Sequence, residues 1–129
     1  MTQNEKDLLL KDLCARLPYG VKVAFFNEDL THHSEPKTLI GIECINNLNY
    51  SRLEDEDGNT TIVEFVKPYL FPLSSVTEEQ KSQYSYFLTR IIDGYDSSLL
   101  IDWFHKNHFD YRGLISMGLA IDATDKNIY

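Results

Sequence analysis

Hydrophobic positions follow a helical period at the start of the chain and again in its C-terminal half, with a strand-like period between them. Residues 1–17 predict one amphipathic helix, over residues 3–16, which Pro18 and Gly20 end. Most of the charged side chains of this segment are expected on its solvent face. The apolar stripe comprises Leu8, Leu9, Leu13 and Leu17, and the charged residues are Glu5, Lys6, Lys11, Asp12 and Arg16.

The region 21–66 is rich in strand-forming residues and predicts a β-rich half. Four apolar stretches separated by turns indicate strands, and Asp57-Gly58 favours a hairpin between the last two. Short strands must curl or pack to hide their apolar face, so we expect a small antiparallel sheet, shaped as an SH3-like, partly open barrel. The strands are expected over residues 21–26, 38–45, 48–54 and 61–66.

The segment after these strands carries two prolines. Pro68 and Pro72 predict an extended crossing that leaves the sheet and leads to the next helix, because proline lacks the N–H group that a strand ladder uses. The apolar side chains of this crossing are expected between the sheet and the helices that follow.

Residues 77–118 predict a helical half. Thr77 and Gln80 form a capping-box pattern ahead of a helix over residues 78–92. A second helix is expected over residues 97–108, and a short strand over 119–123. The chain is therefore expected to be α+β, one domain over residues 1–129, with two or three C-terminal helices packed on the sheet. The boundaries are marked by Gly94, by Asp96 or Ser97, and by Gly113 and Gly118.

Composition narrows the class of protein. A chain of 129 residues with 43% hydrophobic and 25% charged residues has the ordinary make-up of one globular domain. Its formal net charge of -8 argues against direct nucleic-acid binding, which needs clustered Lys and Arg. An acidic surface that imitates DNA towards a basic partner is one alternative.

The cysteines and the N-terminus indicate the compartment. Cys14 and Cys44 stand alone in apolar patterns and are expected to be buried thiols in a reducing environment. The N-terminus lacks the basic start and apolar run of a signal peptide, and no apolar stretch approaches the length of a membrane span. We therefore expect a cytoplasmic protein with no membrane partner.

Metal chemistry has one weak candidate site. In a helix over 97–108, Asp102, His105 and His108 recur at every third position and could hold zinc or iron for a hydrolase. The outer two would lie roughly 120° apart around the helix, which is wide for ligands of one ion. Packing of the two histidines against the apolar stripe is therefore the favoured interpretation.

The acidic run over residues 54–57 resembles a calcium loop, but the pattern fails at its first position. With Gly58 as the sixth loop residue, the first ligand would be Leu53, which has no side-chain oxygen. A solvated hairpin tip is the expected structure.

Aromatic residues gather around the stretch that follows the second C-terminal helix. We expect this group to join the helical half to the sheet, either as a structural interface or as part of an interaction surface. Its members are Tyr69, Phe71, Trp103, Phe104, His108, Phe109, Tyr111 and Arg112.

Three blocks of the chain resemble a family of small uncharacterised proteins encoded by gut bacteria of the Bacteroidetes group and by their phages and mobile elements. The blocks are DLCARLPYGVKV (12–23), VKPYLFPLSSVTEEQ (66–80) and NHFDYRGLI (107–115). The resemblance implies a cytoplasmic bacterial or phage setting and one compact domain. It implies no activity, cofactor or catalytic residue.

The leading hypothesis for function is a non-enzymatic protein–protein interaction or regulatory module. The chain has no catalytic signature, and its 8 Tyr, 7 Phe and 1 Trp are residue types that interfaces favour. The partner is a protein of unknown identity, and a homodimer is one form that the contact could take. The alternatives are a metal-dependent hydrolase using Asp102, His105 and His108, and an inhibitor of the DNA-mimic type.

Overall fold

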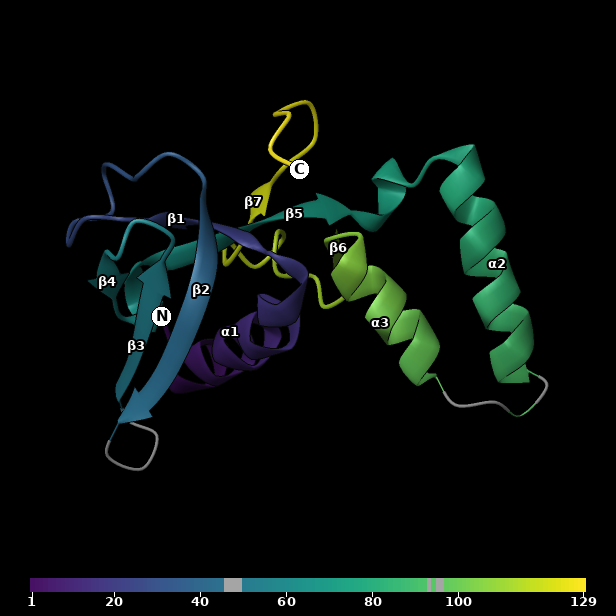
Figure 1. Ribbon diagram of the computed structural model, residues 1–129, viewed down its shortest axis with the longest axis horizontal. Helices are drawn as coiled ribbons and strands as arrows, with labels where there is room; N and C mark the ends of the chain where they lie inside the picture. The colour runs from purple at the N-terminus through teal and green to yellow at the C-terminus, as the bar shows by residue number, and fades with distance from the viewer. Residues whose placement is uncertain (46–49, 93, 95–96) are drawn as a thin grey trace.

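The computed structural model describes residues 1–45, 50–92, 94 and 97–129. It confirms the mixed α+β class, with an N-terminal helix, a seven-stranded sheet and C-terminal helices (Figure 1).

Helix α1 (Gln3–Arg16) begins with a capping box, in which Thr2 and Glu5 satisfy each other's backbone N–H groups. Its bounds match the predicted helix. Of the charged residues, most of which were expected on the solvent face, Glu5, Lys6 and Lys11 are not buried, but Asp12 and Arg16 are fully buried. The buried face of the helix consists of Leu9, Asp12, Leu13 and Arg16.

The sheet has the strand order β4-β3-β2-β1-β5-β6, and β7 pairs with β5 beside that path. Strands β1 to β5 pair antiparallel, whereas β6 and β7 join β5 in parallel, so the sheet is mixed where an antiparallel one was expected. The sheet is open, and the SH3-like barrel is not confirmed. The strands are β1 (Lys22–Phe25), β2 (Lys37–Ile45), β3 (Tyr50–Asp55), β4 (Thr60–Thr61), β5 (Val66–Pro72), β6 (Phe109–Asp110) and β7 (Ile121–Asp122).

The segment 60–75 departs most from expectation. The strand predicted over 61–66 is split, because the 3-10 turn η2 (Val63–Phe65) separates β4 from β5. Residues 67–72 of the predicted crossing, which was expected over residues 67–74, belong to β5, and this strand pairs with β1, β6 and β7. Prolines at the third and last positions of β5 hid this strand, because its pairing depends on partners far away in the sequence. Two further 3-10 turns are η1 (Leu17–Tyr19) and η3 (Leu73–Ser75).

Helix α2 (Glu78–Ile92) follows the predicted capping box, in which the Thr77 hydroxyl accepts from Gln80 N at 3.2 Å and Gln80 Oε1 accepts from Thr77 N at 2.9 Å. Gly94 follows it with a left-handed φ of 94°, as expected for a helix stop. Helix α3 (Ser98–Lys106) ends two residues earlier than predicted. Asp96, one of the two expected start residues of this helix, lies outside the described residues.

Both C-terminal helices were expected to pack on the sheet, but only one of them lies close to it. Figure 1 places α2 at the end of the molecule opposite β3 and β4, with α3 between α2 and the rest of the fold. None of the residues of α2, all of which the structure describes, is buried. Helix α3 buries four, namely Leu100, Trp103, Phe104 and His105.

Three clusters of buried apolar residues hold the fold together. The first lies between α1 and the sheet and includes Leu9, Leu13 and Leu70. The second joins α3 to β6 around Trp103 and Phe109, and the third surrounds Tyr69 beneath β7 and the following tail.

Cys14 and Cys44 are both exposed, so the prediction of buried thiols was wrong. On α1, Cys14 directly follows Leu13 and therefore lies about 100° around the helix from that buried side chain. An apolar neighbourhood in the sequence did not establish which face of the helix the thiol occupies.

Candidate functional site

A buried ion cluster connects α1 to the segment after β6. The Asp12 carboxylate accepts from Arg16 Nε at 2.8 Å and from Arg112 Nε at 3.0 Å. Arg16 Nη2 donates to the Phe109 carbonyl oxygen at 2.6 Å. The side chains of Asp12 and Arg16 are 0% exposed. Such groups are stable inside a protein only when their charges are matched, so the cluster fixes the position of α1 relative to β6.

The loop that begins at Asp110 is organised by that residue's side chain. Its two carboxylate oxygens accept from the backbone N–H groups of Leu114 and Ile115, each at 2.9 Å. Arg112 does not take part in this turn, because it pairs with Asp12 instead. Asp110 and Arg112 therefore have separate structural roles.

The three metal candidates have different surroundings. Asp102 is exposed, whereas His105 is buried and its Nε2 lies 2.7 Å from the Tyr111 hydroxyl. His108 lies beyond the end of α3. Within the described residues, no group of three His, Cys, Asp or Glu side chains is arranged to hold a metal ion.

His108 has a strained backbone and a stacked ring. Its φ is 61°, a left-handed conformation that residues other than Gly seldom adopt, and it reverses the chain between α3 and β6. The imidazole stacks on the Tyr129 ring with centroids 3.6 Å apart and planes 11° apart. Burial, followed by the positive charges of Arg16 and Lys22, lowers the pKa of His108 from 6.5 to about 4, so the ring is neutral at pH 7.

Most of the predicted aromatic group lies where α3 meets β5 and β6, whereas Tyr69 belongs to the cluster beneath β7. Trp103 stacks on Phe109 with centroids 5.4 Å apart, and Phe104 stacks on Tyr111 at 5.3 Å. Phe71 packs beside Phe109 at 6.2 Å. Tyr69, Trp103, Phe104 and Phe109 are buried, while Phe71, His108, Tyr111 and Arg112 are half-buried.

Sequence reasoning missed Asp12, Arg16 and Tyr129. For the first two a signal existed, because positions 9, 12, 13 and 16 form one helical face, on which both charged residues fall. For Tyr129 the sequence held no such signal. Its hydroxyl donates to the Tyr69 carbonyl oxygen at 2.7 Å and accepts from Lys22 N at 2.8 Å, and burial raises its pKa.

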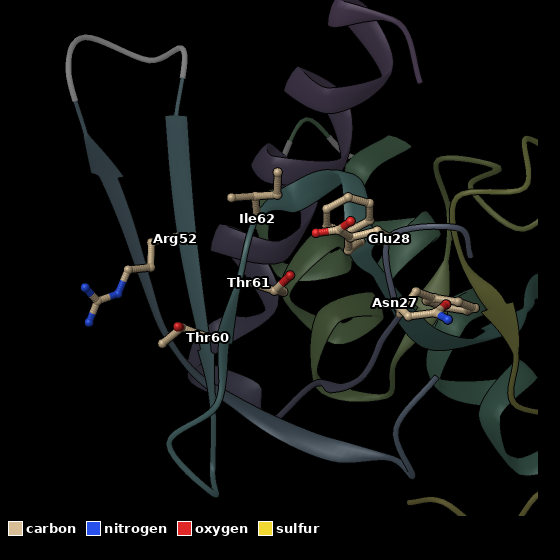
Figure 2. A pocket seen from close by; sticks show the side chains of 8 residues that line it. Asn27, Glu28, Arg52, Thr60, Thr61 and Ile62 are labelled. Atoms are coloured by element: carbon tan, nitrogen blue, oxygen red, sulfur yellow. The ribbon is translucent and has the colours of Figure 1, made fainter. Parts of the chain in front are cut away.

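A cavity of about 350 Å³ lies in the β-rich half, between the loop after β1 and the β3–β4 edge (Figure 2). Figure 2 shows the Arg52 guanidinium directed away from Glu28, the other charged residue of the cavity. The two charged groups therefore do not converge on one point, as polar groups do in a specific small-molecule site. The lining residues are Phe26, Asn27, Glu28, Arg52, Thr60, Thr61, Ile62 and Phe65.

A second cavity, also of about 350 Å³, lies on the surface of the α2–α3 pair and is mainly apolar in its lining. We call it the hairpin groove, and it is lined by Ser82, Gln83, Tyr86, Phe87 and Trp103. Trp103 Nε1 donates to Gln83 Oε1 at 2.8 Å and so holds the two helices together at the groove. Large apolar side chains stand exposed on the same two helices, namely Tyr86 (57%), Leu88 (36%), Ile92 (83%), Leu99 (52%) and Ile101 (36%).

Comparison with known proteins gives no relative: no protein-family model, no curated protein and no solved structure matches the chain. Among the described residues, no helix has both the length and the apolar character that crossing a membrane requires.

Proposed function

We propose that the protein is a non-enzymatic protein–protein interaction module that acts in the cytoplasm of a bacterium, in the setting of a phage or mobile element, and binds its partner through the α2–α3 hairpin. One observation carries the proposal. Helix α2 is rich in aromatic and aliphatic residues, yet it buries none of them fully within the described fold.

Isolated helices of about 15 residues are marginal in water, and most helices in proteins are stabilised by packing an apolar face. Helix α2 packs Tyr84, Phe87 and Ile91 only partly, against the cluster on α3. Both flanks of that face carry further exposed apolar residues, with Leu88 and Ile92 on one and Tyr86 on the other. An exposed apolar surface beside a groove is typical of a protein contact.

The β-rich half would then be the scaffold, and we propose an SH3-like, partly open barrel as its shape. Strands β4 and β5 lie at opposite ends of the run β4-β3-β2-β1-β5, although only residues 62–65 separate them. A flat run of five strands would hold its edges about 19 Å apart. The connection over residues 62–65 includes a helical turn and therefore spans less than this distance. The five strands therefore have to curl to bring β4 and β5 within its reach.

The two alternative functions have less support. The hydrolase would need Asp102, His105 and His108 to face one ion. Asp102 is instead exposed, His105 contacts Tyr111, and His108 stacks on Tyr129. For the DNA mimic, Asp55 in the middle of the acidic run is only 1% exposed, because its carboxylate accepts from the backbone N–H groups of Asp57 and Asn59. The turn residues 56–59 are exposed, which confirms the expected solvated hairpin tip, whereas Asp55 at the end of β3 is withdrawn from the surface.

Site-specific photo-cross-linking in cells tests the proposal. A photoreactive residue at position 86 should form a covalent adduct with a protein, because Tyr86 lies in the hairpin groove and is 57% exposed. The matched control is position 40 on β2, where Ile40 is 53% exposed. Equal adducts at both positions, or none at position 86, would show that the hairpin is not the binding surface.

A further inference from the structure

We infer that the protein bound at the hairpin groove is a second copy of this chain, with the two α2 helices antiparallel around a two-fold axis. The inference rests on the proposed function and identifies its partner. It follows from the order of side chains along one face of α2, from the charge of that face, and from the residues that line the groove.

One face of α2 carries opposite charges at its two ends. Glu79, Gln83, Tyr86 and Arg90 follow the spacing i, i+4, i+7, i+11, which keeps them on one side of a helix. Glu79 lies in the first turn and Arg90 in the last. The Arg90 guanidinium lies 5.7 Å from the centroid of the Tyr86 ring, so it stays on this face.

This order is complementary to itself when a second copy runs in the opposite direction. With the two-fold axis midway between Gln83 and Tyr86, Glu79 of each copy faces Arg90 of the other. Tyr86 of each copy then faces Gln83 of the other, beside Trp103, and can enter the hairpin groove. In a two-fold interface each of these contacts between the two copies occurs twice.

The charge of this α2 face also favours a second copy. Glu79 and Arg90 are its charged residues, so its net charge is zero, whereas the chain as a whole carries -8. Identical acidic molecules repel each other through most of their surface, and they repel least through a neutral face.

Charge reversal with a complementing partner tests the arrangement, using sedimentation equilibrium of the full chain over a range of concentrations. The wild-type chain should dimerise. E79R and R90E should each weaken the dimer by about tenfold or more, because each replaces two attractive pairs by two repulsive ones. The double variant E79R/R90E should recover wild-type association to within about threefold, since it restores both pairs with reversed sign.

A mixture of the two single variants provides the sharpest control. E79R offers two arginines on this face and R90E offers two glutamates, so the mixed dimer should form although each variant alone is weakened. Circular dichroism of every variant confirms that α2 is folded. A loss of association caused by unfolding would not be reversed by mixing.

Other outcomes overturn the inference and separate it from the proposed function. A wild-type chain that stays monomeric, while position 86 cross-links to a different protein, retains the interaction module and excludes the second copy. A monomer with no adduct at position 86 overturns both. A dimer that is insensitive to R90E and E79R has its interface elsewhere, which overturns the inference.

Discussion

Helices α1 and α2 have similar lengths, 14 and 15 residues, and similar N-terminal capping boxes, yet they relate to the fold in opposite ways. Helix α1 buries two leucines together with Asp12 and Arg16. Helix α2 buries none of its residues and exposes Tyr86, Leu88 and Ile92. Capping and length therefore make a helix, but they do not determine whether the rest of the fold depends on it.

The comparison extends to the regions that contain these helices. The β-rich half has a core of fully buried side chains and an ion cluster that ties it to the tail. Helix α2 of the hairpin is held only by partly buried side chains, which pack on the buried cluster of α3. Regions with few buried contacts open at lower free energy, and binding surfaces are often found in them.

The largest expected effect comes from the ion cluster. Asp12→Ala leaves the guanidinium groups of Arg16 and Arg112 without their carboxylate, so the free energy of unfolding should fall by about 3–5 kcal/mol. Urea unfolding followed by circular dichroism measures it. The control is Glu78→Ala on α2, which removes the exposed pair with Lys81 and should change stability little. A small effect at Asp12 would mean that the cluster does not hold α1 to the segment after β6.

Removing an apolar side chain from each region gives the next contrast. Leu70 on β5 is fully buried, and Leu70→Ala should lower the free energy of unfolding by about 2–5 kcal/mol. Ile92→Ala, at an 83% exposed position, should change it by no more than about 0.5 kcal/mol. Both are measured by denaturant unfolding at a concentration where the chain is monomeric. A large loss at Ile92 would indicate that it packs inside the monomer.

Acid should destabilise the fold through His108, which lies between the two regions. The unfolded chain takes up a proton near pH 6.5, whereas the folded chain does so only near pH 4. The stability from the neutral ring is therefore complete above pH 6.5 and is lost as the pH falls to about 4. Because the ring is partly exposed, we expect a loss of about 1 kcal/mol, well below the full value of the shift. His105 contributes in the same direction, since burial lowers its pKa.

The variant His108→Asn separates the two histidines. Asn tolerates the left-handed backbone but cannot take up a proton in this range. The fall in thermal midpoint between pH 7 and pH 4 should therefore be smaller in the variant than in the wild type. An equal fall in both would assign the acid sensitivity to other groups.

The smallest effect concerns the two N-terminal caps. Thr77→Ala should cost α2 about 1 kcal/mol, which corresponds to roughly fivefold faster amide exchange in that helix. Amides of β5 should be unaffected. Thr2→Ala should instead lower the stability of the whole fold, because α1 is part of the main core. Hydrogen exchange read by mass spectrometry measures both. Faster exchange in β5 of Thr77→Ala would show that the hairpin does not open independently.

Features with local causes could be predicted from the sequence. The bounds of α1 and α2, the Gly94 stop and the hairpin at Asp57-Gly58 depend on periodicity, caps and turn residues within a few positions of each other. Their agreement with the structure shows that neighbouring residues suffice to define these elements.

Features with distant causes could not be predicted from the sequence. Strand β5 was missed because its three partner strands come from residues before and long after it, and its prolines argued against a strand. The ion cluster of Asp12, Arg16 and Arg112 was missed because charged residues on a helix are usually exposed. His108 was placed inside a helix that ends at Lys106, since nothing local marks a left-handed histidine.

The ion cluster has a consequence for how the chain folds as it is synthesised. Arg16 meets a carbonyl group 93 positions later, and Asp12 meets a guanidinium 100 positions later. Leu114 and Leu119 also complete the core beneath α1. Until these late residues leave the ribosome, the pair of Asp12 and Arg16 lacks Arg112 and the Phe109 carbonyl oxygen, and it lies against an unfinished apolar layer. The N-terminal region therefore gains its stability late in translation, although it is made first.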